Sequence, residues 1–218
     1  MEQNAKNISK WRAFWRIQKE CLRRAITPYM MYLIMSMLLL VCQALASVSL
    51  PLMFVLSVIC ILGGIAYNAH LCFLTGQKHL DAYIAGELHR KNELFGIHSG
   101  GDHRPEREYR PYKGFVIGFY VGIPVLLFGI LAGAFPALEG PGLLALIMFA
   151  GWAIIPVRWL NIYGGLNVSN FLSLVMIVIP VIISGVFYIV GAQVQAKKRS
   201  EREERMEEAK NTGKKGKK

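Results

Sequence analysis

Imidazole and carboxylate groups lie close together in one short stretch of the chain, His98-Ser-Gly-Gly-Asp102-His103. These are side chains that bind zinc and other divalent cations. Two further histidines, His79 and His89, precede the stretch. The stretch is also rich in glycine, is followed by proline and has no hydrophobic periodicity, which is typical of a solvated loop. We therefore expect a polar loop at His98, Asp102 and His103. A metal site is the alternative, and no other cofactor is indicated.

Glycines form a second pattern, because they recur every fourth residue in an apolar segment. Small residues at this spacing allow another helix backbone to approach closely within a bilayer, where lipid supplies no hydrophobic drive for helix association. The pattern indicates a helix-packing face, although glycine is also generally common in membrane helices. The residues concerned are Gly114, Gly118, Gly122, Gly129 and Gly133.

Aromatic and basic residues alternate at helical spacing over residues 10–26. This pattern is typical of a helix in the membrane interface, with rings at headgroup depth and cations near anionic phosphates. A plain basic flank is the alternative. We expect lipid headgroups, not nucleic acid, to be the partner, and the Thr27-Pro28 step to end this helix. The interface residues are Trp11, Arg12, Phe14, Trp15, Arg16, Arg23 and Arg24.

Charge is confined to three parts of the 218-residue chain, which has 25 Lys and Arg against 14 Asp and Glu. Residues 1–28, 76–113 and 196–218 contain every charged residue except Glu139 and Arg158. A soluble domain is about one quarter charged throughout. The distribution excludes a soluble globular protein and indicates a multi-pass membrane protein.

The apolar stretches predict an all-α integral membrane bundle with five hydrophobic segments. They cover residues 29–47, 51–75, 114–136, 141–157 and 171–195. The chain then divides into a basic interfacial segment (1–28), a transmembrane hairpin (29–75), a polar cytoplasmic loop (76–113), further membrane helices (114–195) and a charged tail (196–218). Within the loop, an apolar stripe from His79 to Phe95, closed by Gly96, indicates a helix. Pro124 and Pro180 are expected to kink their helices.

The short fourth segment decides the topology. Its 17 residues reach only about 25 Å as a helix, whereas the hydrocarbon core is about 30 Å thick. Five crossings would also place the basic tail opposite the other basic segments, against the positive-inside rule. We expect four full crossings, with residues 141–157 short or re-entrant, and both termini in the cytoplasm. Five crossings remain the alternative.

No catalytic residue is indicated, because the apolar segments carry no acidic or basic side chain at their centres. His70, near the end of the second segment, is expected to be a hydrogen-bonded interfacial histidine. The function favoured is a non-enzymatic membrane scaffold, assembly or accessory subunit that acts through helix packing and basic cytoplasmic surfaces, with other membrane proteins as candidate partners. A small transporter or channel component is the first alternative, and an enzyme using the His98–His103 loop the second. A bacterial cytoplasmic membrane is the default location.

Overall fold

The computed structural model describes the backbone of residues 2–96, 104–135 and 140–215, with side chains at all of these except 2–10, 132–133, 140–143, 145, 170 and 211–215. Helices and no strands occur within these residues, so the expected all-α fold is confirmed. The elements in chain order are α1 (Glu2–Ala44), η1 (Leu45–Ser47), α2 (Leu50–Leu94), η2 (Pro105–Arg107), α3 (Tyr112–Ala134), α4 (Gly140–Ile162), η3 (Asn170–Ile177) and α5 (Val178–Lys215).

Helices α1 and α2 are longer than the sequence predicts. Helix α1 continues through Pro28, so the predicted break at Thr27-Pro28 is wrong. Pro28 cannot donate to the carbonyl of Arg24, but a helix that enters a bilayer tolerates proline, because other conformations leave more backbone groups unsatisfied. Helix α2 continues from its apolar part to Leu94, which makes the first half of the predicted polar loop helical. Gly96 then adopts a left-handed conformation, with φ of 72°.

Within the described residues, four helices are long and apolar enough to cross a membrane, covering Trp11–Ser47, Leu50–Leu94, Tyr112–Leu131 and Phe171–Lys210. The apolar stretch of α4, Leu146–Ile162, is shorter. A spanning helix needs about 20 apolar residues. The molecule is therefore a helical membrane protein with four helices of membrane length and one short segment.

Helix α4 is broken at Ala150, whose φ of −135° and ψ of 15° lie outside the helical region. The break lies against α1, where the backbone N–H of Trp152 donates to Ser36 Oγ at 3.0 Å. The Ser36 hydroxyl in turn donates to the carbonyl of Tyr32 at 2.9 Å. An unsatisfied N–H costs several kcal/mol in hydrocarbon. Ser36 therefore makes the break in α4 possible.

The two arms of α4 on either side of this break contact different helices. The first arm carries Phe149, whose ring stacks on Phe128 of α3 with centroids 5.1 Å apart. The second arm carries Trp159, whose ring lies 5.6 Å from that of Phe54, close to the α1–α2 turn. Ser36 lies about 12 Å along the helix axis from the end of α1 at Ala44, because an α-helix rises 1.5 Å per residue. The break thus divides segment 141–157 into two arms that pack on different helices. Glu139 lies outside the described residues.

Helix α5 begins later than its apolar segment. Residues Asn170–Ile177 form a 3-10 helix, and the α-helix starts at Val178. Pro180 therefore lies in the first turn of α5, where backbone N–H groups have no intrahelical acceptor. The predicted kink inside a long helix at Pro180 is wrong. Helix α3, by contrast, does contain Pro124 in its interior.

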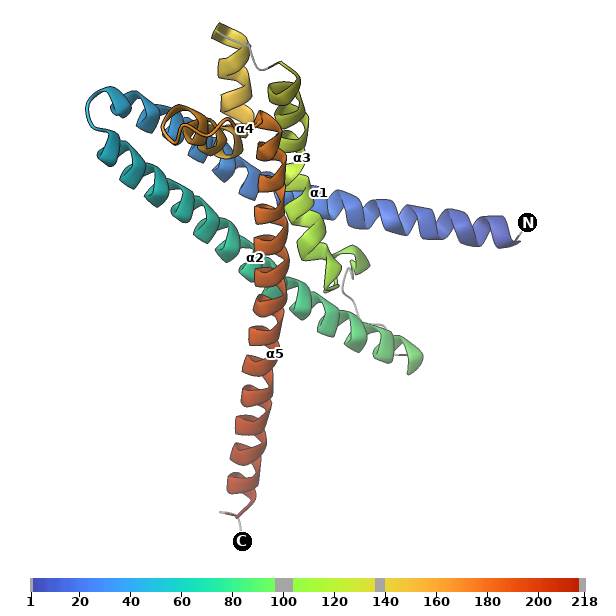
Figure 1. Cartoon of the computed structure of the whole chain (residues 1–218). Helices are drawn as coiled ribbons and strands as arrows, with labels where there is room; N and C mark the ends of the chain where they lie inside the picture. Colours follow the sequence, from blue (N-terminus) through green and yellow to red (C-terminus); the bar gives the residue numbers. More distant parts are fainter. Residues whose placement is uncertain (1, 97–103, 136–139, 216–218) are drawn as a thin grey trace.

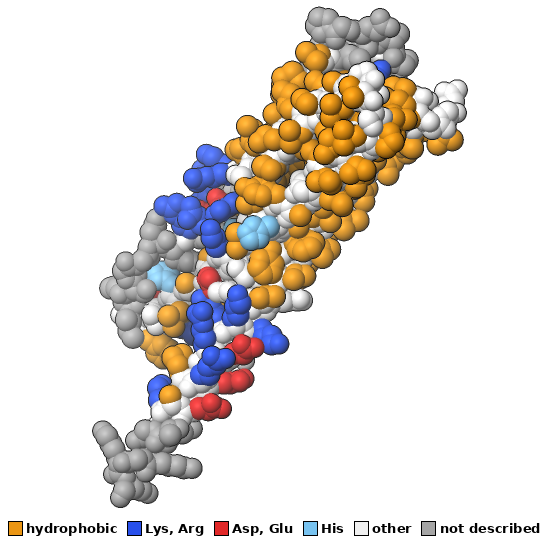
Figure 2. All heavy atoms as spheres, turned by 90° about the vertical axis from the view of Figure 1, so that its left-hand side faces the viewer, with side chains coloured by type: hydrophobic (Ala, Val, Ile, Leu, Met, Phe, Trp, Pro, Cys, Tyr) orange, Lys and Arg blue, Asp and Glu red, His pale blue; other side chains and the backbone are white. Residues whose placement is uncertain are grey.

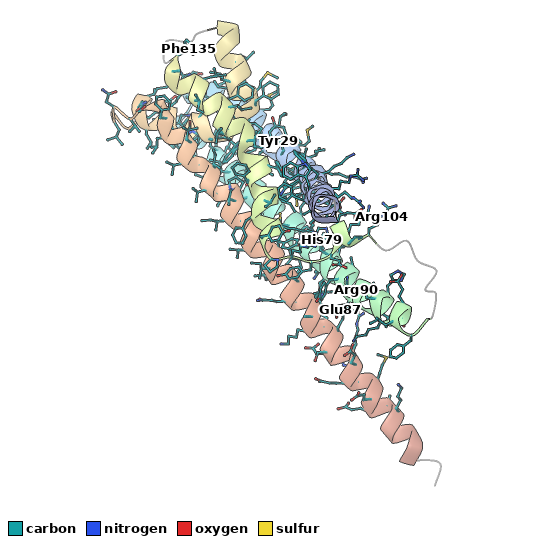
Figure 3. All side chains as sticks on the ribbon, turned by 90° about the vertical axis from the view of Figure 1, so that its right-hand side faces the viewer. Tyr29, His79, Glu87, Arg90, Arg104 and Phe135 are labelled. Atoms are coloured by element: carbon teal, nitrogen blue, oxygen red, sulfur yellow. The ribbon has the colours of Figure 1, made fainter. Side chains whose placement is uncertain are left out.

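Charged and apolar surfaces separate along the molecule. In Figure 2 hydrophobic side chains cover the upper part of the visible face, and charged side chains gather below them. Figure 3 shows Phe135 at one end, Glu87 and Arg90 toward the other, and Tyr29 and His79 between them. We call the part formed by residues 11–28, 76–94, 104–113 and 196–210 the charged end. All three charged segments of the sequence meet there.

Candidate functional site

Ion pairs join the elements of the charged end. Arg199 of α5 donates to Asp81 of α2, with Nη2 and Oδ1 2.6 Å apart. Arg90 of α2 pairs with Glu108, which follows η2, at 2.6 Å. Partly exposed pairs of this kind each contribute little to stability, about 0–1 kcal/mol. These ion pairs instead connect α2 to α5 and α2 to the η2 segment, and they help to orient the three elements relative to one another.

Lys113 connects the η2 segment to α3 from inside the protein. The side chain is fully buried. Its ammonium donates to the carbonyl oxygens of Glu106 and Glu108, both at 2.6 Å. A buried ammonium is stable only when it is paired or hydrogen-bonded. These two bonds therefore hold the loop against the start of α3.

A histidine and two tyrosines lie deeper, where α2, α5 and the η2 segment meet. His79 Nδ1 and the hydroxyl of Tyr188 are 2.9 Å apart, and both side chains are buried. The ring of Tyr188 stacks on that of Tyr109 at 5.4 Å between centroids. Burial raises the pKa of the Tyr109 hydroxyl. His79 Nε2 has no hydrogen-bond partner within the described part of the chain. His79, Tyr188 and Tyr109 thus link α2, α5 and the η2 segment.

An asparagine makes the corresponding link between α1, α2 and α5 in the apolar part of the molecule. Buried Asn68 donates from Nδ2 to the hydroxyl of Tyr32 at 3.3 Å and to that of Ser184 at 3.2 Å. Cys72 Sγ donates to Asn68 Oδ1 at 3.6 Å. Hydrogen bonds between membrane helices contribute about 0.6 kcal/mol on average, up to about 1.7. The cluster defines how the three helices meet.

His70, which the sequence predicts to be a hydrogen-bonded interfacial histidine, does not take part in this cluster. Its side chain is exposed. No hydrogen bond of His70 occurs among the described residues. Asn68 is only two residues away, but residues two apart project about 200° apart around a helix. The sequence shows both polar residues near the end of the apolar segment, and only the packing of α5 shows which one is inside.

The glycine face of α3 is occupied by this chain itself. A Cβ on Gly114 would lie 2.6 Å from Tyr188 Cβ, and a Cβ on Gly118 would lie 2.6 Å from Val181 Cα of α5. On Gly122 and Gly129 it would come within 2.9 Å of side chains in η3. The surroundings of Gly133 lie outside the described residues. Helix α5 and η3 therefore cover the part of this face that the structure describes.

A close backbone contact between two helices involves glycines that sequence analysis did not select. A Cβ on Gly76 of α2 would collide with the backbone carbonyl of Tyr188, and a Cβ on Gly191 of α5 with that of Phe73. The two glycines thus face each other's helix where α2 and α5 cross (Figure 1). Each is isolated in sequence, so no repeat pattern identifies it.

The first half of α1 has two different faces. Trp11, Phe14 and Trp15 are exposed and touch one another, with ring centroids 5.7 to 6.3 Å apart. Arg12, Arg16 and Arg23 are exposed as well, whereas Arg24 is partly buried and bonds Glu20 at 3.0 Å. Ile17, Cys21 and Ala25 form the buried face. The predicted interface residues therefore project from one end of the molecule.

The predicted metal loop cannot be placed. His98, Asp102 and His103 lie outside the described residues. Elsewhere, over residues 2–96, 104–135 and 140–215, no group of three His, Cys, Asp or Glu side chains is arranged to hold a metal ion. Upstream, His79 bonds Tyr188, and His89 lies 3.2 Å from Glu93.

Comparisons with models of protein families, with curated proteins and with solved structures find no match for this chain.

Proposed function

We propose that this membrane protein is a scaffold, assembly or accessory subunit that holds partner proteins at its charged end on the cytoplasmic side. The observation that carries the proposal is the convergence of all three charged segments at one end of the molecule. Lys and Arg outnumber Asp and Glu across the chain, 25 to 14. Excess positive charge near the ends of spanning helices is typical of the cytoplasmic side.

The use of the buried polar groups supports a structural role over a catalytic one. Asn68, Ser36 and Lys113 each bond to another element of the chain. Groups used in this way hold helices together, and they are not free to exchange protons with a substrate. The same argument disfavours a coupled transporter, which places ionisable groups near the bilayer midplane.

The extension of α5 provides a surface for a partner. Residues 201–210 continue the helix, and all of them are exposed. A helix that is polar on all sides either bridges between bodies or is stabilised by charge pairs along its surface. Here Ser200 donates to Glu204 one turn later at 3.3 Å. Basic and acidic residues alternate over this stretch, which suits a partner with a mixed charged surface.

The orientation is tested by single cysteines at Glu139, Asn161 and Ser200 in a chain whose four native cysteines are replaced. An impermeant thiol reagent on intact cells should label positions 139 and 161 and leave 200 unlabelled. Labelling of 139 and 200 without 161 contradicts the proposed four-crossing arrangement.

The partner role is tested by gentle solubilisation of membranes that contain the tagged full chain. We expect a partner chain in a fixed ratio, lost when Arg202 and Arg205 are both changed to Glu. The matched control changes both to Lys, which preserves the charge and should preserve the ratio. Equal recovery from the two variants, or substrate flux through liposomes that contain this protein alone, contradicts the proposal.

A further inference from the structure

A cavity of about 290 Å³ opens between α1 and α2, next to η2. Thr27 and Pro28 line it from α1, and Thr75 lines it from α2. These residues border the apolar segments 29–47 and 51–75, so the cavity lies at the level where the bilayer meets the charged end. Small-molecule sites occupy about 300–1,000 Å³. The cavity therefore suits a headgroup and not a whole lipid.

The charged residues at the cavity are all basic. Arg23 and Arg24 come from α1, Lys78 from α2 and Arg107 from η2. Glu20 lies beside them and bonds Arg24 at 3.0 Å, with Arg107 at 3.8 Å. Among the described residues no carboxylate pairs with Arg23 or Lys78. Four cations from three elements thus face one hollow with one nearby carboxylate, which leaves an excess of positive charge for an anion to neutralise.

A second, apolar hollow of about 410 Å³ lies further along the same two helices, inside the membrane. On α1 the lining of both hollows follows intervals of three and four residues, which is one stripe of a helix. The stripe consists of Arg23, Arg24, Thr27, Pro28, Met31, Ile34, Met35, Leu38 and Cys42. Polar ligand groups at the bilayer boundary and an apolar groove beneath it are the two parts that a phospholipid requires.

We propose that the basic cavity binds the phosphate of an anionic phospholipid, with an acyl chain along the apolar hollow. Arginine matches phosphate oxygens with two parallel N–H donors, and lysine adds a compact charge. The Thr27 hydroxyl is a further donor at the rim. Leu71, Leu74 and Ile117 form apolar walls beside the cations. These walls favour a lipid over a free phosphate ester, because a soluble anion gains nothing from them.

The test uses the full chain in detergent and native mass spectrometry with added lipid. We expect one phosphatidylglycerol to be retained, and phosphatidylcholine, which has no net charge, to be retained at least tenfold less. Arg23→Gln combined with Lys78→Gln should reduce phosphatidylglycerol retention at least tenfold. Equal retention of the two lipids by the unaltered protein overturns the proposal.

The matched control is Arg12→Gln combined with Lys19→Gln. It also removes one arginine and one lysine from exposed positions of the charged end, but neither residue lines the cavity. Retention by this control should equal that of the unaltered protein. An equal loss in both double variants would mean general attraction by the basic surface, and it overturns a site in the cavity.

Two additional measurements keep the proposal testable if charge removal disturbs folding. Thr27→Phe leaves the charge unchanged and fills the cavity from an exposed position, so it should also abolish retention. Glycerol 3-phosphate and inorganic phosphate test the source of the anion. Neither should displace phosphatidylglycerol at equal concentration; displacement by either one overturns the lipid assignment in favour of a soluble phosphate.

Discussion

Two sides of α2 have opposite surroundings. One side packs tightly against α5, and the other borders an open cavity next to α1. At Gly76 the backbone of α2 touches that of α5 so closely that no side chain fits between them. At Thr75 and Lys78 the same helix borders an open basic cavity against α1. Successive residues of a helix point about 100° apart. One turn of α2 therefore contributes both to a close backbone contact with α5 and to the wall of the basic cavity.

The difference shows how a small membrane protein separates stability from binding. The α2–α5 crossing depends on the absence of side chains, so backbones meet and van der Waals contact is maximal. The α1–α2 side instead carries long cationic side chains around an open cavity. Changes on the first side should alter folding, and changes on the second side should alter what is bound.

The largest expected effect is at the crossing. Gly76→Ala should lower the free energy of unfolding by about 1–3 kcal/mol, because its Cβ meets a backbone carbonyl that can move only with α5. Thermal unfolding in detergent measures this loss. Gly63→Ala is the control, because a Cβ there meets nothing within 4 Å. The control should gain about 0.5–1 kcal/mol from helix propensity. Equal stability of the two variants would remove the claimed difference.

A smaller effect is expected from the polar cluster beneath the crossing. Asn68→Leu keeps a side chain branched at the same position but removes the amide, which leaves the hydroxyls of Tyr32 and Ser184 without this partner. We expect a loss of about 0.6–1.7 kcal/mol, the range for hydrogen bonds between membrane helices. Equilibrium unfolding in detergent provides the value. His70→Leu, at the exposed position two residues later, should change it by less than about 0.5 kcal/mol. A larger loss at His70 than at Asn68 would reverse our assignment.

The smallest expected effect is at the cavity. Arg23→Gln should change stability in lipid-free detergent by less than about 0.5 kcal/mol, as surface substitutions do. In the presence of phosphatidylglycerol, its unfolding temperature should rise less than that of the unaltered protein, because a ligand stabilises only the state that binds it. An equal rise in both proteins would show that the two sides of α2 do not differ as described.

Apolar length and charge placement were sufficient to predict the helical class and the short fourth segment. The continuation of α1 through Pro28 was not predictable from local preference, since proline disfavours helix only where an alternative satisfies the backbone. The repeated glycines of α3 were visible by their spacing, whereas Gly76 and Gly191 matter only because α2 and α5 cross there. Arg23 was assigned to the predicted interfacial helix, whereas Lys78 lay unremarked within the predicted polar loop. These two side chains line the same cavity because of the way α1 and α2 pack together, and no local sequence pattern predicts that packing.

The break in α4 has a consequence for the order in which the protein is made. The N–H of Trp152 finds its acceptor, Ser36, more than a hundred residues earlier in the chain. Until α1 is in the bilayer, the middle of α4 would carry an unsatisfied amide into hydrocarbon, which costs several kcal/mol. We therefore expect α4 to be an unbroken helix until it meets α1, because a regular helix satisfies this N–H with its own carbonyls. The final shape of this segment would then be a product of tertiary assembly, which its own sequence does not determine.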